Sequence, residues 1–183
     1  TNTVCEGELQ QVHHRGNFDL SQQQYIEIIT RKTATLIGVC CKLGGHFAGA
    51  DPLVVNALER FGLNFGIAFQ ITDDVLDIVG TEDRMGKTLG LDLKKRKLTL
   101  PLIHCLARAG TEDHRILHSL LKSSELDQVA LRKLLDKTDS INFSFQTARE
   151  YIDSSTGALN ILSPSDAHDA LRRMAAMVVD REQ

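Results

Sequence analysis

The feature that most constrains the fold is a long apolar segment between Asp51 and Gly80. Asp51 is followed by Pro52, which is the usual order of an N-cap carboxylate and the first residue of a helix. Apolar side chains then recur at helical spacing as far as Gly80 and cover most sides of the predicted helix. Such a helix belongs in a protein core, so other elements of the chain must surround it.

A second long helix is predicted just before this segment. Ser21 and Gln24 have the spacing of a capping box, and Gly44-Gly45 supply a stop signal, so we expect a helix over about 22–43. Lys32 interrupts the apolar stripe of this helix, and its ammonium should therefore point inward. A lysine that extends along its neighbours to water explains the position equally well. The apolar residues of the stripe are Tyr25, Ile28, Ile29, Leu36, Cys40 and Leu43.

The remainder of the chain carries further helix signals and no strand signals. Residues 80–97 are rich in glycine and charge, and we expect a polar loop there. Thr99-Leu100-Pro101 then starts a short helix that Gly110 closes. Because sustained alternation of period two is absent, the sequence predicts an all-α fold, a packed helical bundle. Later helix starts are predicted at Thr111, Ser124, Ser140 and Ser163-Pro164.

Composition narrows the possible classes of protein. The 183 residues are 42% hydrophobic, which is enough for one domain with a core. A net charge of -3 gives no general reason to expect nucleic acid or an anionic membrane as a partner. No apolar run reaches the roughly 18 residues of a membrane-spanning helix, so no membrane span is expected.

The cysteines and the first residues add two further expectations. The four cysteines lack metal-ligand spacing, so they are expected to be buried, reduced thiols in a cytoplasmic protein. The segment 4–9 resembles part of a helix more than a leader peptide, which suggests a truncated chain. The cysteines are Cys5, Cys40, Cys41 and Cys105.

Clustered oxygen-bearing side chains occupy the last turns of the predicted core helix. Gln70, Asp73, Asp74 and Asp77 follow the i, i+3, i+4, i+7 rule and therefore share one face. Acidic residues on helices usually lie in a first turn or on a solvated face, but this cluster is near the C-terminal end, where the helix dipole disfavours negative charge. A binding site for a hard cation such as Mg²⁺, completed by the phosphates of a substrate, explains better than a solvated face why three carboxylates gather at this unfavourable position.

Basic residues follow the cluster directly. Gly86-Lys87, Gly90 and Asp92 precede the run Lys94-Lys95-Arg96-Lys97. Glycine permits close backbone approach to a ligand, and lysine provides a mobile point charge for phosphate. Such a run alone would suggest a nuclear-localisation signal, a nucleic-acid patch or a solvated face. Its position beside the carboxylates instead indicates a diphosphate.

The segment 69–77, Phe-Gln-Ile-Thr-Asp-Asp-Val-Leu-Asp, resembles the second aspartate-rich motif, FQxxDDxxD, of the trans-isoprenyl diphosphate synthases. The resemblance is close from residue 4 to about 110 and includes two departures. Thr88 stands where the family usually has proline, and Lys94-Lys95-Arg96 replaces a stretch that often contains glycine before Lys97. Companion motifs in family order are Glu6-Gly7-Glu8, Lys32-Thr33-Ala34, Gly86-Lys87, Gly90, Asp92, Lys97 and Thr99-Leu100-Pro101.

This resemblance implies a helical bundle of the isoprenoid synthase type. Residues 1–183 would be the C-terminal part of a single polyprenyl synthase domain, about half of it, because the family's first aspartate-rich motif lies on N-terminal helices that are absent. The implied reaction is the Mg²⁺-dependent condensation of isopentenyl diphosphate with an allylic diphosphate to a long-chain polyprenyl diphosphate. The chain alone would be inactive, and family members usually form homodimers.

The resemblance also implies roles for individual residues. Metal ligands would be Asp73 first, with Asp74, Asp77 and Asp92 completing or orienting its shell. Lys32, Lys87 and Lys97 would contact the diphosphate. Thr33 and Gln70 would flank the reacting carbon, so that Lys32, Thr33, Gln70 and Asp73 form the catalytic group.

Other functions fit the same sequence less well. A noncatalytic or regulatory subunit of a heteromeric synthase would keep the fold, but the intact aspartates and lysines weigh against it. A terpene cyclase also ionises diphosphates with Mg²⁺, although the Lys32-Thr33 and Gly86-Lys87 companions resemble those of chain elongation. A helical interaction module is the remaining alternative.

Overall fold

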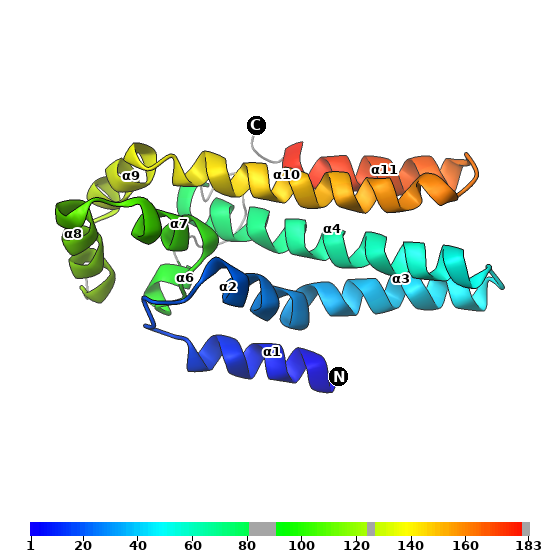
Figure 1. Cartoon of the computed structure of the whole chain (residues 1–183), viewed down its shortest axis with the longest axis horizontal. Coiled ribbons are helices and arrows are strands. Elements are labelled where there is room, and N and C mark those ends of the chain that lie inside the picture. The colour runs from blue at the N-terminus through cyan, green and yellow to red at the C-terminus, as the bar shows by residue number, and fades with distance from the viewer. Residues whose placement is uncertain (81–90, 124–126, 181–183) are drawn as a thin grey trace.

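The computed structural model describes residues 1–80, 91–123 and 127–180, and no strand occurs in that part of the chain. The all-α fold predicted from the sequence is confirmed (Figure 1). No described helix is long and apolar enough to cross a membrane. The elements are α1 (Asn2–His13), α2 (Gln22–Ile29), η1 (Thr30–Ala34), α3 (Thr35–Phe47), α4 (Pro52–Val79), α6 (Leu91–Lys94), α7 (Leu100–Arg108), α8 (Thr111–Lys122), α9 (Gln128–Lys137), α10 (Ser140–Ala158), η2 (Leu159–Ile161) and α11 (Asp166–Val179).

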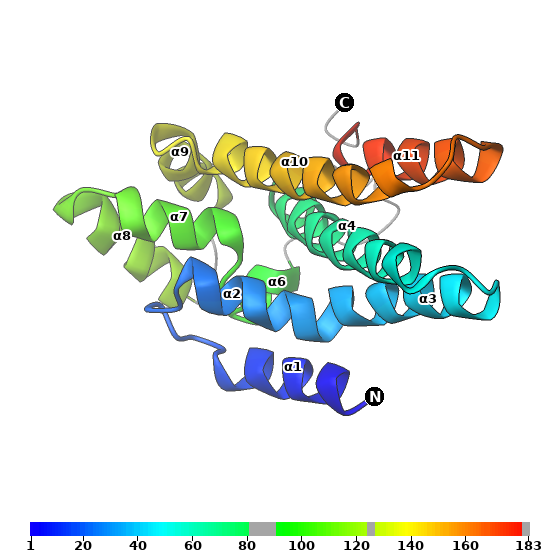
Figure 2. The ribbon, with the colours of Figure 1, turned by 45° about the vertical axis from the view of Figure 1, so that its right-hand side comes forward.

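Helix α4 is the centre of the bundle, as its apolar sequence predicts. It lies between α3 and α10, while α11 packs against α10 and α1 packs against η1 (Figures 1 and 2). Its first turn is capped by the Asp51 carboxylate, which accepts a hydrogen bond from Leu53 N at 2.8 Å, and Gly80 follows its last residue. Phe61, Ile71 and Val75 on this helix are fully buried. Each such side chain stabilises the fold by about 1.5–3 kcal/mol.

The predicted helix over 22–43 exists, but it is interrupted by a π-helical turn. The capping box is present, since Ser21 and Gln24 exchange hydrogen bonds in both directions. Residues 30–34, which include Lys32 and Thr33, form the π-helix η1. A π turn adds one residue to the helix, so every later side chain is rotated by about 100° from the position that regular α periodicity predicts.

That rotation makes the predicted apolar stripe wrong beyond Lys32. Leu36 is 58% exposed and Leu43 is 44% exposed. The next residue in sequence takes the core position instead, because Ile37 and Cys41 pack against the buried cluster. Tyr25, Ile28 and Ile29, which precede the π turn, are buried as predicted.

Several predicted boundaries also differ from the structure. Gly44-Gly45 do not stop the helix, which continues to Phe47 before Gly49 turns the chain with φ +72°. In the predicted loop over 80–97, residues 81–90 lie outside the described part, and residues 91–94 form the short helix α6.

The predicted helix starts at Thr111 and Ser140 are confirmed, since α8 and α10 begin there. The start at Ser124 lies outside the described residues, and Asp127 caps α9. Ser165, two residues after the predicted start at Ser163-Pro164, caps α11. The four cysteines are unpaired in the structure, as expected, but Cys5 and Cys40 are exposed and only Cys105 is buried.

Helices α3 and α4 approach closely where α4 carries glycine. A Cβ atom on Gly66 would lie 2.6 Å from Ala34 Cα, and one on Gly62 would lie 2.8 Å from Gly38 Cα. Both distances are shorter than any ordinary carbon contact, and the opposing atoms belong to backbone that cannot move aside cheaply. The close crossing holds η1 against α4 and so fixes the segment that carries Lys32 and Thr33.

Gly66→Ala should therefore lower the free energy of unfolding by about 1–3 kcal/mol, because the added methyl group overpacks the helix crossing. Gly44 provides the matched control, since it lies inside α3 with nothing within 4 Å of its Cβ position. Gly44→Ala should raise the same free energy by up to about 1 kcal/mol through helix propensity. Urea unfolding followed by circular dichroism measures both, and equal effects of the two substitutions would refute the tight crossing.

Candidate functional site

Helix α1 contacts the π-helix η1 through a glycine. Gly7 is buried, and a Cβ atom there would lie 2.5 Å from Lys32 N. This approach lets Glu8 pair with Lys32, with 2.8 Å between Oε2 and Nζ, while Gln11 Oε1 accepts a second hydrogen bond from the same ammonium. Lys32 thus extends along α1, neither inserted into the core nor free in water. Its hydrogen bond lowers the pKa of Glu8.

The π-helix brings Thr33 against α4. Thr33 Oγ1 donates a hydrogen bond to Gln70 Oε1 at 2.8 Å, and Gln70 Nε2 donates to Asp74 Oδ1 at 2.8 Å. The structure thus brings together the two residues that the resemblance placed beside the reacting carbon. Because its oxygen and nitrogen both have partners, the Gln70 amide has one defined orientation.

Asp74 is fully buried and accepts hydrogen bonds on both oxygens. Its Oδ1 also accepts from Lys97 Nζ at 2.7 Å, and its Oδ2 accepts from the Tyr25 hydroxyl at 2.9 Å. Burial raises the pKa of Asp74, an effect that the Lys97 ammonium opposes. Burial, followed by the charge of Asp74, raises the pKa of Tyr25 well above its usual value.

Lys97 joins Asp74 to the short helix α6. Its ammonium donates to Asp92 Oδ2 at 2.9 Å, and the backbone N–H of Asp92 donates to Asp77 Oδ2 at 3.1 Å. Burial alone would lower the pKa of Lys97, but the two carboxylates beside it raise the pKa above its usual value. We call the hydrogen-bonded set Thr33, Gln70, Asp74, Lys97 and Asp92 the site network.

Asp73 is half-buried on the same helix, whereas Asp77 is buried. Lys87, the third predicted diphosphate ligand, lies outside the described residues, as do Gly86, Thr88 and Gly90. Within 1–80, 91–123 and 127–180, no three His, Cys, Asp or Glu side chains gather closely enough to hold a metal ion by themselves. A metal ion bound here would therefore need further oxygen ligands in addition to the His, Cys, Asp and Glu side chains of these residues.

Arg96, beside Lys97, has a left-handed backbone with φ +54°. Its carbonyl accepts a hydrogen bond from Gly16 N at 3.0 Å, which ties this turn to the end of α1. The conformation costs a residue with a Cβ atom about 1–2 kcal/mol, and glycine adopts it freely. In this chain Lys94-Lys95-Arg96 replaces a stretch that often contains glycine in the family that the sequence resembles. Arg96 therefore adopts this left-handed conformation at an energetic cost that glycine would avoid.

Arg96→Gly should accordingly raise the free energy of unfolding by about 1 kcal/mol. The neighbouring Lys95 is also exposed but does not have positive φ, so Lys95→Gly should lower that free energy by a few tenths to about 1 kcal/mol. Thermal and urea unfolding compare the two variants. A loss of stability in Arg96→Gly equal to that in Lys95→Gly would contradict the strained turn.

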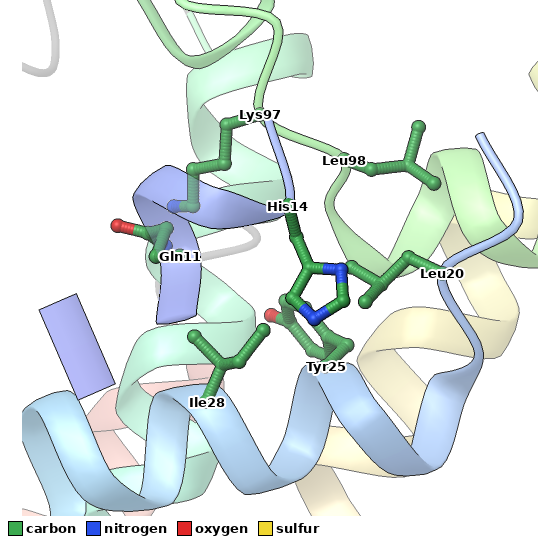
Figure 3. Close-up of a pocket in the computed structure, with 7 residues that line it drawn as sticks. All are labelled: Gln11, His14, Leu20, Tyr25, Ile28, Lys97 and Leu98. Atoms are coloured by element: carbon green, nitrogen blue, oxygen red, sulfur yellow. The ribbon is translucent and has the colours of Figure 1, made fainter. Parts of the chain in front are cut away.

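A small cavity of about 10 Å³, roughly the space of one water molecule, lies beside the site network between α1 and α2 (Figure 3). His14 and Tyr25, which the sequence did not mark as site residues, both line this cavity. A tyrosine on a buried stripe needs a partner for its hydroxyl, which is the signal that could have identified Tyr25. The lining residues are Gln11, His14, Leu20, Tyr25, Ile28, Lys97 and Leu98.

The fold places the chain in the isoprenoid synthase class, and solved structures agree. A polyprenyl synthase from Caulobacter crescentus, complexed with calcium and isoprenyl diphosphate, matches with a TM-score of 0.91 and 32% identity over 100% of this chain and 56% of that protein. A decaprenyl diphosphate synthase from Rhodobacter capsulatus matches with a TM-score of 0.90 and 30% identity over 100% of this chain and 57% of that protein.

The chain belongs to the polyprenyl synthetase family, whose sequence model matches residues 1–138. It is 33% identical over 180 residues to the short chain isoprenyl diphosphate synthase of Methanothermobacter thermautotrophicus, covering 98% of this chain and 55% of that relative. It is 34% identical over 183 residues to the heptaprenyl diphosphate synthase component 2 of Geobacillus stearothermophilus, covering 98% and 56%. The chain thus spans about half the length of these curated relatives.

Proposed function

We propose that this chain supplies one side of the active site of a trans-prenyltransferase that condenses isopentenyl diphosphate with an allylic diphosphate. One observation carries the proposal: the site network joins residues of η1, α4 and the α6 region, each predicted separately from the sequence. Relatives named as isoprenyl and polyprenyl diphosphate synthases support the substrate class. The names of the relatives range from short chain to heptaprenyl and decaprenyl, and we propose a long-chain product from the resemblance of the sequence.

The residues present fit a magnesium ion. Mg²⁺ prefers oxygen ligands, keeps several waters and commonly completes its shell with substrate phosphates. We assign Asp73 and Asp77, which lie about one helical turn apart on α4, as the protein ligands of the magnesium ion. Both oxygens of Asp74 already accept hydrogen bonds from protein donors, so we assign Asp74, with Asp92, to orienting the shell. When bound, the ion would neutralise charge on the departing diphosphate.

The chain's own side chains would act by preorganised electrostatics. Two of the three N–H donors of Lys97 bind Asp74 and Asp92, so one donor remains for a phosphate oxygen. Lys32 adds a second positive charge at the edge of η1, and we propose Lys87 as a third. Thr33 and Gln70, fixed by their mutual hydrogen bond, would flank the reacting carbon.

We further propose that the rest of the enzyme covers an apolar stripe on α3. Leu36, Val39, Leu43 and Phe47 follow helical spacing, and each is exposed. Relatives are almost twice as long as this chain, which leaves room for further helices of the same domain and for the family's first aspartate-rich motif. Under this proposal the 183 residues are the C-terminal half of one synthase domain, which acts as a homodimer.

The test is a chimaera in which this chain replaces the matching segment of the Methanothermobacter synthase. It should condense radiolabelled isopentenyl diphosphate with an allylic primer in the presence of Mg²⁺, and chelation of the metal should abolish the product. The unaltered synthase is the positive control, and this chain alone should give no turnover. A folded chimaera that binds both diphosphates without condensing them would instead favour a noncatalytic subunit. Turnover by the isolated chain would overturn the half-domain proposal.

A further inference from the structure

Tyr25, which has no assigned role at the substrate or the metal, is hydrogen-bonded to Asp74 of the site network. Its side chain is 2% exposed, and its hydroxyl donates to Asp74 Oδ2 at 2.9 Å. The two residues are 49 positions apart in sequence and come from α2 and α4. Since a buried phenol loses its hydrogen bonds to water, the pairing is specific and not a by-product of packing.

Asp74 connects Tyr25 to the rest of the site through its two carboxylate oxygens. Its Oδ1 accepts from Gln70 Nε2 at 2.8 Å and from Lys97 Nζ at 2.7 Å, whereas its Oδ2 accepts from Tyr25. The rotation of a carboxylate about its Cβ–Cγ bond is broad, so donors on one oxygen leave its plane loosely defined. A donor on each oxygen fixes the plane and with it the directions of the Gln70 amide and the Lys97 ammonium.

We propose that Tyr25 is a positioning residue of the site: it fixes the plane of Asp74 and thereby aligns Gln70 and Lys97. This inference rests on the proposed function only for its effect on turnover, because the alignment itself is a property of this chain. Tyr25 and Lys97 also line the small cavity beside the site network, together with apolar side chains of Leu20, Ile28 and Leu98 (Figure 3).

The alignment is tested on the 183-residue chain by nuclear magnetic resonance. Tyr25→Phe keeps the ring and removes only the donor, and Tyr151→Phe is the matched control, because the chain has 2 tyrosines and Tyr151 lies on α10. The side-chain amide resonances of Gln70 should shift in Tyr25→Phe and stay in place in Tyr151→Phe. 4-Aminophenylalanine at position 25, which restores a donor, should return them. Unchanged Gln70 resonances in folded Tyr25→Phe would overturn the inference.

Turnover in the chimaera gives the second measurement. Tyr25→Phe should lower kcat by about 10-fold to 100-fold, the range commonly seen when a hydrogen bond outside the ligand shell is lost, and leave the KM for isopentenyl diphosphate unchanged within about 2-fold. Tyr151→Phe should retain full turnover. Equal kcat in Tyr25→Phe and the unaltered chimaera would overturn the positioning role while the proposed function stands. An unaltered chimaera without turnover would overturn the proposed function, and the resonance measurement would still decide the alignment.

Discussion

Lys97→Met should lower the free energy of unfolding by about 3–5 kcal/mol, one of the two largest effects we expect from a single substitution in this chain. Methionine keeps most of the side-chain volume but removes the only cation paired with the fully buried Asp74 in the described structure. Removing one partner of a buried ion pair is far more costly than the pair is worth, since the other charge remains buried without compensation. Urea unfolding of the purified chain measures the loss.

Lys137 provides the matched control for this substitution. It pairs with Asp113 in the same way, but its side chain is 65% exposed, whereas that of Lys97 is 12% exposed. Lys137→Met should therefore cost no more than about 1 kcal/mol. The double substitution of Lys97→Met with Asp74→Asn should recover part of the loss, because the orphaned charge is then gone. A loss of less than 1 kcal/mol in Lys97→Met would show that Asp74 is not buried as an ion pair.

The sequence predicted the central helix almost to the residue, because its signals are local. Asp51 and Pro52 fix the start through the chemistry of unpaired N–H groups, and Gly80 ends it. The shared face of Gln70 and Asp74 also follows from helical geometry alone. Local signals suffice wherever the partner of a residue lies within about four positions in the same helix.

The π turn could not be predicted in the same way. Its hydrogen bonds span one residue more than those of an α-helix, and nothing in the apolar spacing of 22–43 distinguishes the two before the partners are known. The consequence was a one-residue error in the buried face from Leu36 onward. The structure explains it by long-range contact, since α1 packs on η1 at Gly7 and α4 packs on the other side at Gly66.

The contacts of the predicted lysines also depend on distant residues. Lys32 was ambiguous because its partners, Glu8 and Gln11, lie on a separate helix. Lys97 stands 23 positions after Asp74, in a run that by itself suggested a solvated face. The resemblance to a family linked Lys32 to the site, whereas the run containing Lys97 was linked to the carboxylates by its adjacency in sequence. The structure shows that Lys97 forms hydrogen bonds with the carboxylates Asp74 and Asp92.

Asp73→Ala should reduce condensation by the chimaera by at least about 100-fold in kcat. Asp73 is half-buried, unlike Asp74, and we assign it as a direct ligand of Mg²⁺, so its removal would take away charge stabilisation at the departing diphosphate. The free energy of unfolding should change by less than about 1 kcal/mol, because no large apolar contact is lost. Radiometric turnover and urea unfolding of the same variant separate the two effects.

Asp153 on α10 serves as the control for this loss, since it is also an acidic residue within a helix but is exposed and lies outside the site network. Asp153→Ala should keep full turnover and unchanged dependence on Mg²⁺. Raising the Mg²⁺ concentration should recover part of the activity of Asp73→Ala if Asp77 still provides a ligand, because a weakened site is filled by mass action. Full activity of Asp73→Ala at low Mg²⁺ would show that Asp73 is not a ligand of the metal ion.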